Sequence, residues 1–354
     1  MKSFQNIHSA CIEITYRCNL KCQHCIIHLS KRKSDIYISM SDFKDCVTFL
    51  REKGCRVIML SGGEPMLHPQ FKDIYLLLKK EGFGIVLFTN GTFLNSEWLD
   101  FFKKYPIGRL VITLYGSSDD EYASDSFSGE KNIFTNICET LKALPQSGIR
   151  YVVQARVSKH RKDVHDNLLR IFGNTLNMPK ATLVYPRSLH DTENTEYMLS
   201  ADEIVGEVND KRLRERYRSL TTDPFRNETG KAKYHIGCGA GHGSIHITPD
   251  LYVMICAFYR KLSFSLKQYT FDDIFHIHLR SALQEVMSIE SPCYNCSMNK
   301  CCSRCPAMGY GSVGKNAFRD ILCNNARMFM QAGDSEKYLA EDANSTSNCN
   351  FINE

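Results

Sequence analysis

Three cysteines lie close together near the start of the chain, at Cys18, Cys22 and Cys25. They follow a run with the β-branched residues Ile12, Ile14 and Thr15, which predicts a strand. A loop that leaves a strand end can fold its thiols toward one point, where thiolates bind zinc or an iron–sulfur cluster. Three thiols leave one iron of a four-iron cube open to a small molecule. A zinc ion with three protein ligands and a water is the alternative, although structural zinc sites usually have four protein ligands.

Composition places limits on the class of protein. With 354 residues, 43% of them hydrophobic, the chain can form one large domain and a smaller one. The net charge of +5 is mild and no block of like charges is present, so we expect no nucleic-acid partner. No apolar stretch approaches the roughly 20 residues of a membrane helix. The first residues lack the apolar core of a signal peptide, so we predict a cytoplasmic protein without membrane contact.

The 16 cysteines need an explanation. A large cytoplasmic chain does not depend on disulfides, and clustered cysteines in such a chain favour metal binding. Four scattered cysteines, in predicted strands, helices or their edges, are interpreted as core residues: Cys11, Cys46, Cys55 and Cys138.

Strand-like and helix-like segments alternate from the thiol loop to about residue 190. Later strands are predicted at 56–60, 84–88, 109–114, 149–157 and 181–185, and helices at 69–80, 96–104, 132–144 and 160–172. With the first strand, these make six β/α units, which predict a parallel sheet with helices outside it. Six units are fewer than the eight of a closed barrel, so we expect an α/β partial barrel. Its chemistry should lie at the carboxyl ends of the strands.

Candidate ligand-binding residues follow several of these strands. Gly62 and Gly63 let the backbone approach a ligand, and exposed N–H and C=O groups there could hold a zwitterion, although a tight strand-to-helix turn is an equal alternative. Asn90-Gly91 ends the third strand and is by itself a turn signal. Gln154 and Arg156 share one face of the fifth strand. The full set of cofactor-binding candidates is Gly62, Gly63, Glu64, Pro65, Thr89, Asn90, Thr113, Gln154 and Arg156.

The spacing Cys-x3-Cys-x2-Cys resembles the signature of the radical S-adenosylmethionine (SAM) enzymes. This resemblance implies that the three thiols hold a [4Fe–4S] cluster whose open iron binds SAM. One electron then cleaves SAM to a 5′-deoxyadenosyl radical. Residues 62–65 are similar to the family's GGEP element, which contacts the SAM amino group. Thr89, Asn90 and Thr113 are similar to strand-end contacts of the same cofactor. The family also implies a partial barrel.

A second set of cysteines lies toward the end of the chain. Cys238 and Cys256 flank a hairpin-like segment, 244–253, with a Pro-Asp turn. Two zinc sites or two further iron–sulfur clusters would fit the set. Its order resembles the SPASM domain of radical SAM enzymes that modify peptides and proteins. That resemblance implies two auxiliary [4Fe–4S] clusters, one held by Cys293, Cys296, Cys302 and Cys323, the other by Cys238, Cys256 and Cys305.

Three features depart from the SPASM pattern. Leu251 replaces the hairpin glycine, which questions the turn type. The doublet Cys301-Cys302 makes the spacing ambiguous, and Cys302 is favoured as the ligand. The second auxiliary cluster lacks a fourth thiol, and His242, Asp250, Cys301 or the substrate itself could fill that position.

The predicted domains are a radical SAM partial barrel at 7–190, a polar bridging region at 191–236, a smaller cysteine-rich SPASM domain at 237–328 and a polar tail at 329–354. The resemblance implies a maturase that abstracts hydrogen from a ribosomally made peptide and installs a C–C or thioether cross-link. Flavodoxin or ferredoxin would supply the electron. Because the first strand begins near residue 11, we expect a separate protein or another surface to bind the peptide leader.

Two other functions compete with this interpretation. A sulfatase-maturing enzyme, which forms formylglycine, has the same two domains and needs a general base. Asp119, Asp120 and Glu121 are weak candidates for that base, and no catalytic residue is assigned. A zinc-stapled binding module without catalysis is the alternative of another class. The sequence leaves open the peptide, the bond formed and the oligomeric state.

Overall fold

The structure is a computed structural model that describes residues 6–22, 25–27, 35–124, 132–178, 182–183, 199, 203, 240, 243–260 and 262–286. The chain divides into two compact units. The first unit is made of Met1–Met198 and Gly239–Leu283, and it contains almost all of the described residues. The fold and the site described below therefore belong to the first unit.

The first unit is built on one nine-stranded sheet with the order β6-β5-β4-β3-β2-β1-β7-β8-β9. β1 to β6 are all parallel, and β7 also pairs parallel with β1. The predicted α/β class and partial parallel barrel are confirmed. The strands are β1 Ser9–Thr15, β2 Val57–Gly62, β3 Gly84–Thr89, β4 Arg109–Leu114, β5 Tyr151–Val157, β6 Thr182–Leu183, β7 Ser244–Ile247, β8 Tyr252–Met254 and β9 Ser263–Ser265.

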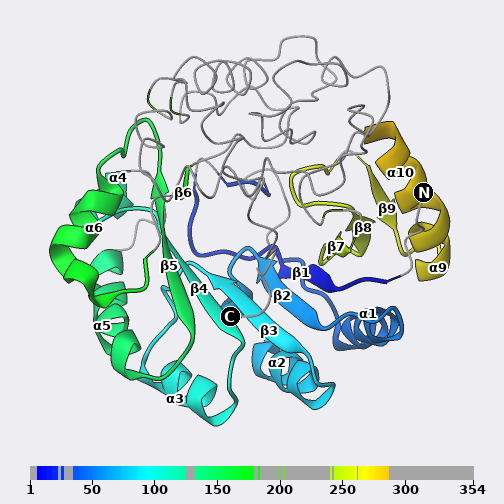
Figure 1. The fold of residues 1–354 in the computed structure, drawn as a ribbon, viewed down its shortest axis with the longest axis horizontal. Helices are drawn as coiled ribbons and strands as arrows, with labels where there is room; N and C mark the ends of the chain where they lie inside the picture. Colours follow the sequence, from blue (N-terminus) through cyan, green and yellow to red (C-terminus); the bar gives the residue numbers. More distant parts are fainter. Residues whose placement is uncertain are drawn as a thin grey trace, which may run out of the picture. The chain divides into compact units, whose positions relative to one another are not determined.

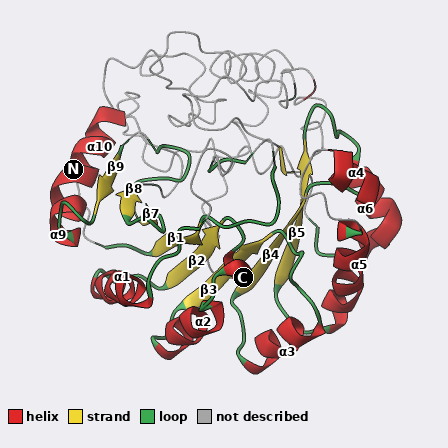
Figure 2. Cartoon of the chain, turned by 180° about the vertical axis from the view of Figure 1, so that it is seen from behind, coloured by secondary structure: helices red, strands yellow, loops and turns green. Residues whose placement is uncertain are grey.

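Five helices follow the parallel strands and lie along one face of the sheet, outside the strands (Figures 1 and 2). They are α1 Met40–Glu52, α2 Phe71–Lys80, α3 Ser96–Lys104, α5 Ile133–Ala143 and α6 Val164–Phe172. The sequence interpretation missed α1, although its N-cap was a readable signal. The Ser39 side chain accepts a hydrogen bond from the Asp42 N–H at 3.1 Å, which satisfies an N–H at the helix start.

The described residues also form shorter helices and helical turns. They are α4 Asp119–Ser124, α9 Phe271–Asp273, a π-helical turn Ile274–His278, α10 Leu279–Val286, and the 3-10 turns Pro65–Leu67, Leu144–Gln146 and Gly173–Thr175. None of the helices in the described part of the chain is long and apolar enough to cross a membrane.

Alternating burial distinguishes the two faces of the sheet. On β3, Ile85 and Leu87 are buried, whereas Val86 and Phe88, which alternate with them, are half-buried. The buried set packs beneath the helices, and each such side chain contributes about 1.5–3 kcal/mol through removal of apolar surface from water. We call the side opposite these helices the inner face. By strand register, it carries Cys11, Glu13, Ser61, Phe88, Thr113, Gln154, Arg156 and His246.

The predicted hairpin is confirmed, and it joins the main sheet. β7 and β8 pair antiparallel across a turn in which Leu251 has a φ of 69°, the left-handed conformation that glycine adopts at little cost. Leu251 thus keeps the backbone shape expected of the glycine it replaces. The predicted domain boundaries remain predictions, because nearly all of 191–236 and all of 287–328 lie outside the described residues.

Candidate active site

The loop after β1 carries the three N-terminal thiols. Cys18, Cys22 and Cys25 are each half-buried. The Leu20 N–H donates to Cys18 Sγ at 3.4 Å, and the Cys25 N–H donates to the Cys22 carbonyl at 3.1 Å. The loop therefore turns back on itself at the carboxyl end of β1, where the sequence predicted the chemistry.

The chemistry of this donor set fits an iron–sulfur cluster. Burial raises the pKa of the Cys18 thiol to about 12, the Leu20 N–H lowers it in part, and Glu64 and Cys25 raise it further. Such a thiol becomes a thiolate only when a cation lies beside it, as a cluster iron would. Within the described residues no three His, Cys, Asp or Glu side chains converge closely enough to hold a metal ion. The three cysteines therefore remain predicted ligands. Their assignment rests on their residue type and on their common position in the loop after β1.

The glycine pair after β2 holds the start of the thiol loop. The N–H groups of Gly63 and Glu64 donate to the carbonyls of Thr15 and Arg17, both at 2.8 Å. A Cβ on Gly63 would lie 2.1 Å from the Arg17 carbonyl oxygen, and one on Gly62 would lie 2.3 Å from that of Thr15. The close approach predicted for these glycines therefore exists, but it is to the backbone before Cys18. These two N–H groups are already used and cannot hold a zwitterion.

Glu64 links this turn to the end of β3. Its carboxylate accepts hydrogen bonds from the Thr89 hydroxyl at 2.9 Å, the Asn90 N–H at 2.8 Å and the Met66 N–H at 3.2 Å. Burial raises the pKa of Glu64 to about 7, and these hydrogen bonds limit the rise. The side chains of Glu64 and Thr89 therefore fix the backbone of the site, and Pro65 begins the short 3-10 turn beyond it.

Asn90 connects β3 to the thiol loop itself. Its side-chain nitrogen donates to Asn19 Oδ1 at 3.0 Å and lies 3.9 Å from Cys18 Sγ. Asn19, which the sequence interpretation did not select, also donates to the Thr92 hydroxyl at 3.0 Å. An N–H directed at a cysteine sulfur stabilises the thiolate form. Asn90 is thus the predicted residue that the structure brings nearest to the first cysteine.

The remaining candidates lie on the inner face. Thr113 and Gln154 are direct neighbours in the β4–β5 register, and Arg156 follows two residues further along β5. Burial raises the pKa of Tyr115 well above its usual value, and the nearby Cys22 thiol raises it further. The sequence interpretation did not select Tyr115. It directly follows β4 and lies near the thiol loop, next to the candidates that the sequence did identify.

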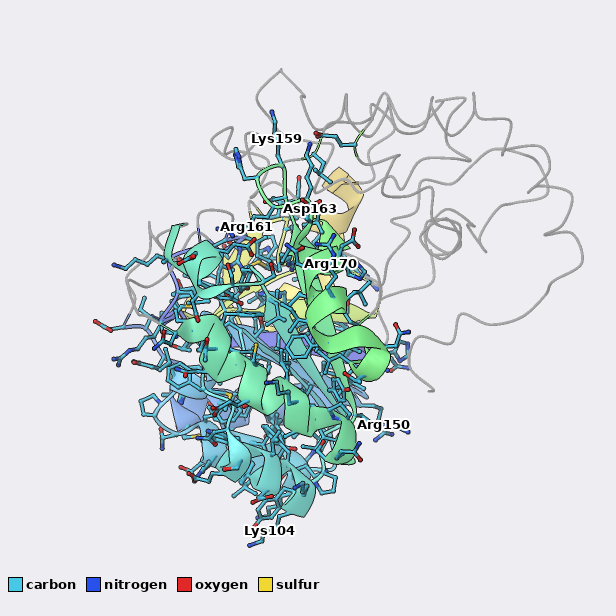
Figure 3. The ribbon with its side chains drawn as sticks, turned by 90° about the vertical axis from the view of Figure 1, so that its left-hand side faces the viewer. Lys104, Arg150, Lys159, Arg161, Asp163 and Arg170 are labelled. Atoms are coloured by element: carbon cyan, nitrogen blue, oxygen red, sulfur yellow. The ribbon has the colours of Figure 1, made fainter. Side chains whose placement is uncertain are left out.

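Two of the three weak base candidates have local structural roles. Asp119 accepts hydrogen bonds from the Phe134 N–H at 2.7 Å and the Thr135 hydroxyl at 2.5 Å, which anchors the start of α5. Glu121 accepts from the Ser117 N–H at 2.5 Å and lies 3.5 Å from Arg161, which comes from the loop after β5 (Figure 3). Asp120 is exposed.

Of the predicted auxiliary ligands, only Cys256 lies in the described residues. It is half-buried, and its Sγ accepts a hydrogen bond from the Phe258 N–H at 3.4 Å. Cys238, Cys293, Cys296, Cys302, Cys305 and Cys323 lie outside the described residues, as do His242 and Cys301. Asp250, another candidate for the missing fourth ligand, accepts hydrogen bonds from the Tyr16 hydroxyl at 2.7 Å and the Thr248 hydroxyl at 2.6 Å.

A buried ion network that the sequence interpretation did not identify links β1 to the hairpin. Glu13 on β1 accepts a hydrogen bond from His246 Nε2 at 2.8 Å and contacts both terminal nitrogens of Arg260. Burial opposes ionisation of Glu13, but His246 and Arg260 outweigh it and lower the pKa to about 2. Burial likewise opposes protonation of His246, but Cys11 and Glu13 raise its pKa to about 9. All three side chains are therefore charged near neutral pH.

Comparison with known proteins agrees with this arrangement. Residues 12–161 match the Radical SAM superfamily. Over 311 residues, 85% of this chain and 65% of the relative, the sequence is 27% identical to the antilisterial bacteriocin subtilosin biosynthesis protein AlbA of Bacillus subtilis. The match spans 65% of the length of that relative, and the matches to three other relatives span between 34% and 42% of theirs.

Two solved structures share the fold. The structure of anSMEcpe with bound AdoMet superimposes with a TM-score of 0.71 at 16% identity, covering 94% of this chain and 99% of that one. Streptococcus suis SuiB bound to its precursor peptide SuiA gives a TM-score of 0.63 at 14% identity, covering 84% of this chain and 71% of SuiB.

The matched superfamily implies a [4Fe–4S] cluster and SAM as cofactors. The matched residues contain most of β1, all of β2 to β5, the thiol loop and the Gly62-Gly63 turn. Residues 12–161 of this chain therefore match the superfamily whose signature the spacing of Cys18, Cys22 and Cys25 resembles.

Proposed function

We propose that this protein is a radical SAM maturase that abstracts a hydrogen atom from a ribosomally made peptide and installs a C–C or thioether cross-link. The observation that carries the proposal is the thiol loop, which Gly63, Glu64 and Asn90 hold at the carboxyl ends of the parallel strands. The likeness to a bacteriocin biosynthesis protein over 85% of this chain supports a peptide as the substrate. SuiB, which shares the fold, was solved with a precursor peptide.

The residues of the chain would have separate roles. Cys18, Cys22 and Cys25 would hold the [4Fe–4S] cluster which, when bound, supplies the electron that cleaves SAM to methionine and a 5′-deoxyadenosyl radical. Gly63, Glu64 and Asn90 fix the thiol loop that would hold the cluster. Thr113, Gln154 and Arg156 present hydroxyl, amide and guanidinium groups along the inner face for SAM and the substrate.

The C-terminal cysteines would hold two auxiliary [4Fe–4S] clusters, which would accept or relay the surplus electron, or hold the substrate. Cys256 lies two residues after the end of β8, a strand that is hydrogen-bonded to β7 and, through it, to β1. An auxiliary cluster at Cys256 would thus be attached to the same sheet as the thiol loop. If that cluster has only three protein thiols, its open iron could bind a substrate thiolate, which suits thioether formation.

Formylglycine formation in a sulfatase is the second candidate function. It needs a general base, and two of the residues considered for that role, Asp119 and Glu121, are hydrogen-bonded within the local structure. This observation favours the cross-linking maturase. A zinc-stapled module without catalysis is disfavoured by the match to the Radical SAM superfamily.

The proposal includes partners as well. Flavodoxin or ferredoxin would reduce the first cluster, and a separate protein or another surface would bind the peptide leader. Anaerobic activity with a purified flavodoxin in place of dithionite would test the first of these. Pull-down of a small protein encoded beside this gene would test the second.

The deciding experiment is an anaerobic assay with the reconstituted protein. The expected results are a brown protein with bound iron and sulfide, formation of 5′-deoxyadenosine from SAM, and a peptide product two hydrogens lighter that contains a cross-link. An aldehyde product would instead identify formylglycine chemistry, and colourless protein with zinc would identify the binding module. Failure of the loaded protein to cleave SAM under strong reductant would refute the proposal. A substrate-dependent change in the auxiliary-cluster spectrum would support thiolate binding, and its absence would count against it.

A further inference from the structure

The ion network of Glu13, His246 and Arg260 has an unusual feature at its centre. The Arg260 side chain is 9% exposed, yet its Nε–H has no hydrogen-bond partner among the described residues. A buried donor without an acceptor destabilises the folded state, and more so when it belongs to a charged group. Native proteins seldom leave such a group unsatisfied. We therefore expect Nε–H to have an acceptor that is not one of the described residues.

The geometry of the pair explains why this donor is left over. Glu13 contacts the two terminal nitrogens of Arg260 and so uses the end of the planar guanidinium. A guanidinium has a second two-pronged edge, formed by Nε–H and one terminal N–H, which matches a carboxylate. Glu13 therefore orients Arg260 and leaves this edge available for a second acceptor.

The charges in the network indicate what kind of acceptor belongs there. Arg260 and His246 are cationic and Glu13 is anionic, which leaves one positive charge in excess among these three side chains; the Cys11 side chain also faces His246. The exposed fraction of the three side chains is 9% or less. An unbalanced charge in so dry a site is costly, and an anion with hydrogen-bonding oxygens removes that cost.

The network also lies on the same face of the sheet as the candidate cofactor-binding residues Thr113, Gln154 and Arg156. Glu13 and His246 belong to the inner face, because Glu13 is paired in register with Ser61, and His246 with Cys11. Glu13 is two residues before Thr15, the residue to which the Gly63 turn is hydrogen-bonded. Arg260 follows Cys256, the predicted auxiliary ligand, by four residues.

We infer that Arg260, oriented by Glu13, is a positioning residue that binds a carboxylate of the substrate peptide on the inner face of the sheet. The inference rests on the proposed function and adds a substrate feature to it: an aspartate, a glutamate or the C-terminal carboxylate near the residue to be modified. The side chain takes no part in bond cleavage.

Equilibrium binding tests the inference without turnover. The reconstituted, SAM-loaded protein is titrated calorimetrically with N-acetyl-aspartate N-methylamide and with the uncharged N-acetyl-asparagine N-methylamide. We expect the aspartate compound to bind at least 10-fold more tightly. In Arg260→Lys, which keeps a cation beside Glu13 but lacks the Nε donor, the preference should fall below about 3-fold. Arg170→Lys is the matched control, since Arg170 is exposed on the outer helix α6, where it donates a hydrogen bond to Asn167 (Figure 3).

Each other outcome overturns the inference. Equal affinity of the unaltered protein for the two compounds would mean that water or another segment of the chain fills the edge, and this comparison remains decisive even if Arg260→Lys loses its iron. A preference that survives in Arg260→Lys would place the carboxylate elsewhere. A preference seen only without SAM would show that the carboxylate of SAM fills the edge. Binding is measured apart from 5′-deoxyadenosine formation. Loss of SAM cleavage would therefore refute the proposed function, whereas the binding preference would still decide whether Arg260 holds a carboxylate.

Discussion

Replacing Gly63 by alanine should disable the site without touching any cofactor-binding side chain. The added Cβ would lie 2.1 Å from the Arg17 carbonyl oxygen and 2.8 Å from that of Tyr16, where real Cβ contacts are longer than 3.0 Å. The two backbones must therefore separate by about 1 Å, which strains the Gly63–Thr15 and Glu64–Arg17 hydrogen bonds. At about 0.5–1.5 kcal/mol each, their loss destabilises the fold by roughly 1–3 kcal/mol.

The larger effect should be on chemistry, because Arg17 directly precedes Cys18. A displacement of about 1 Å in a positioned reacting group can cost on the order of 100-fold in rate. The assay is 5′-deoxyadenosine formation per bound iron under anaerobic conditions. Gly84→Ala is the matched control, since a Cβ there meets nothing closer than 3.6 Å among the residues described. Wild-type cleavage in the Gly63→Ala protein would refute the role given to this close approach.

Three further perturbations have defined outcomes. Cys22→Ala should abolish 5′-deoxyadenosine formation, whereas Cys138→Ala, at a half-buried position on α5, should retain it; loss in both would point to misfolding. The pKa of Glu13 is lowered from 4.5 to about 2, so its stabilisation is complete above pH 4.5 and is lost toward pH 2. The pKa of His246 is raised from 6.5 to about 9, so its stabilisation is complete below pH 6.5 and is lost as pH rises toward 9. The contribution of this pair should therefore be greatest near pH 4.5–6.5, and thermal unfolding above pH 6.5 should show about 3 kcal/mol lost in the wild type that is not lost in His246→Phe. Asp119→Ala should destabilise the protein by about 1–2 kcal/mol, because α5 loses the cap that Asp119 provides. SAM cleavage should continue. A complete loss of peptide turnover with normal stability would instead favour a catalytic carboxylate.

Local patterns were sufficient to predict most of the sheet. Strands such as Gly84–Thr89 and Tyr151–Val157 bury every second residue, because one face packs under helices. Helices such as Phe71–Lys80 show the corresponding 3.6-residue spacing. The helix Met40–Glu52 was missed although Ser39 and Asp42 formed a readable cap, so that failure lay in the interpretation.

The site was only partly predictable, since its key contacts are between distant segments. The glycines at 62 and 63 indicated a close approach, but the partners are the backbones of Thr15 and Arg17, which no local pattern specifies. Glu13 is the one charged residue of the strand Ser9–Thr15, which was a sign of a buried charge. Its partner His246 is 233 residues away, and only the three-dimensional pairing of β1 with β7 identifies it.

The position of β1 between β2 and β7 has a consequence for biosynthesis. During translation, the second edge of this strand stays unpaired until residues beyond 244 have left the ribosome, and Glu13 meanwhile lacks both of its cationic partners. An open, largely apolar strand edge invites pairing with other chains. A truncated protein that stops at residue 198 should for this reason aggregate, even though it contains the whole segment that matches the superfamily.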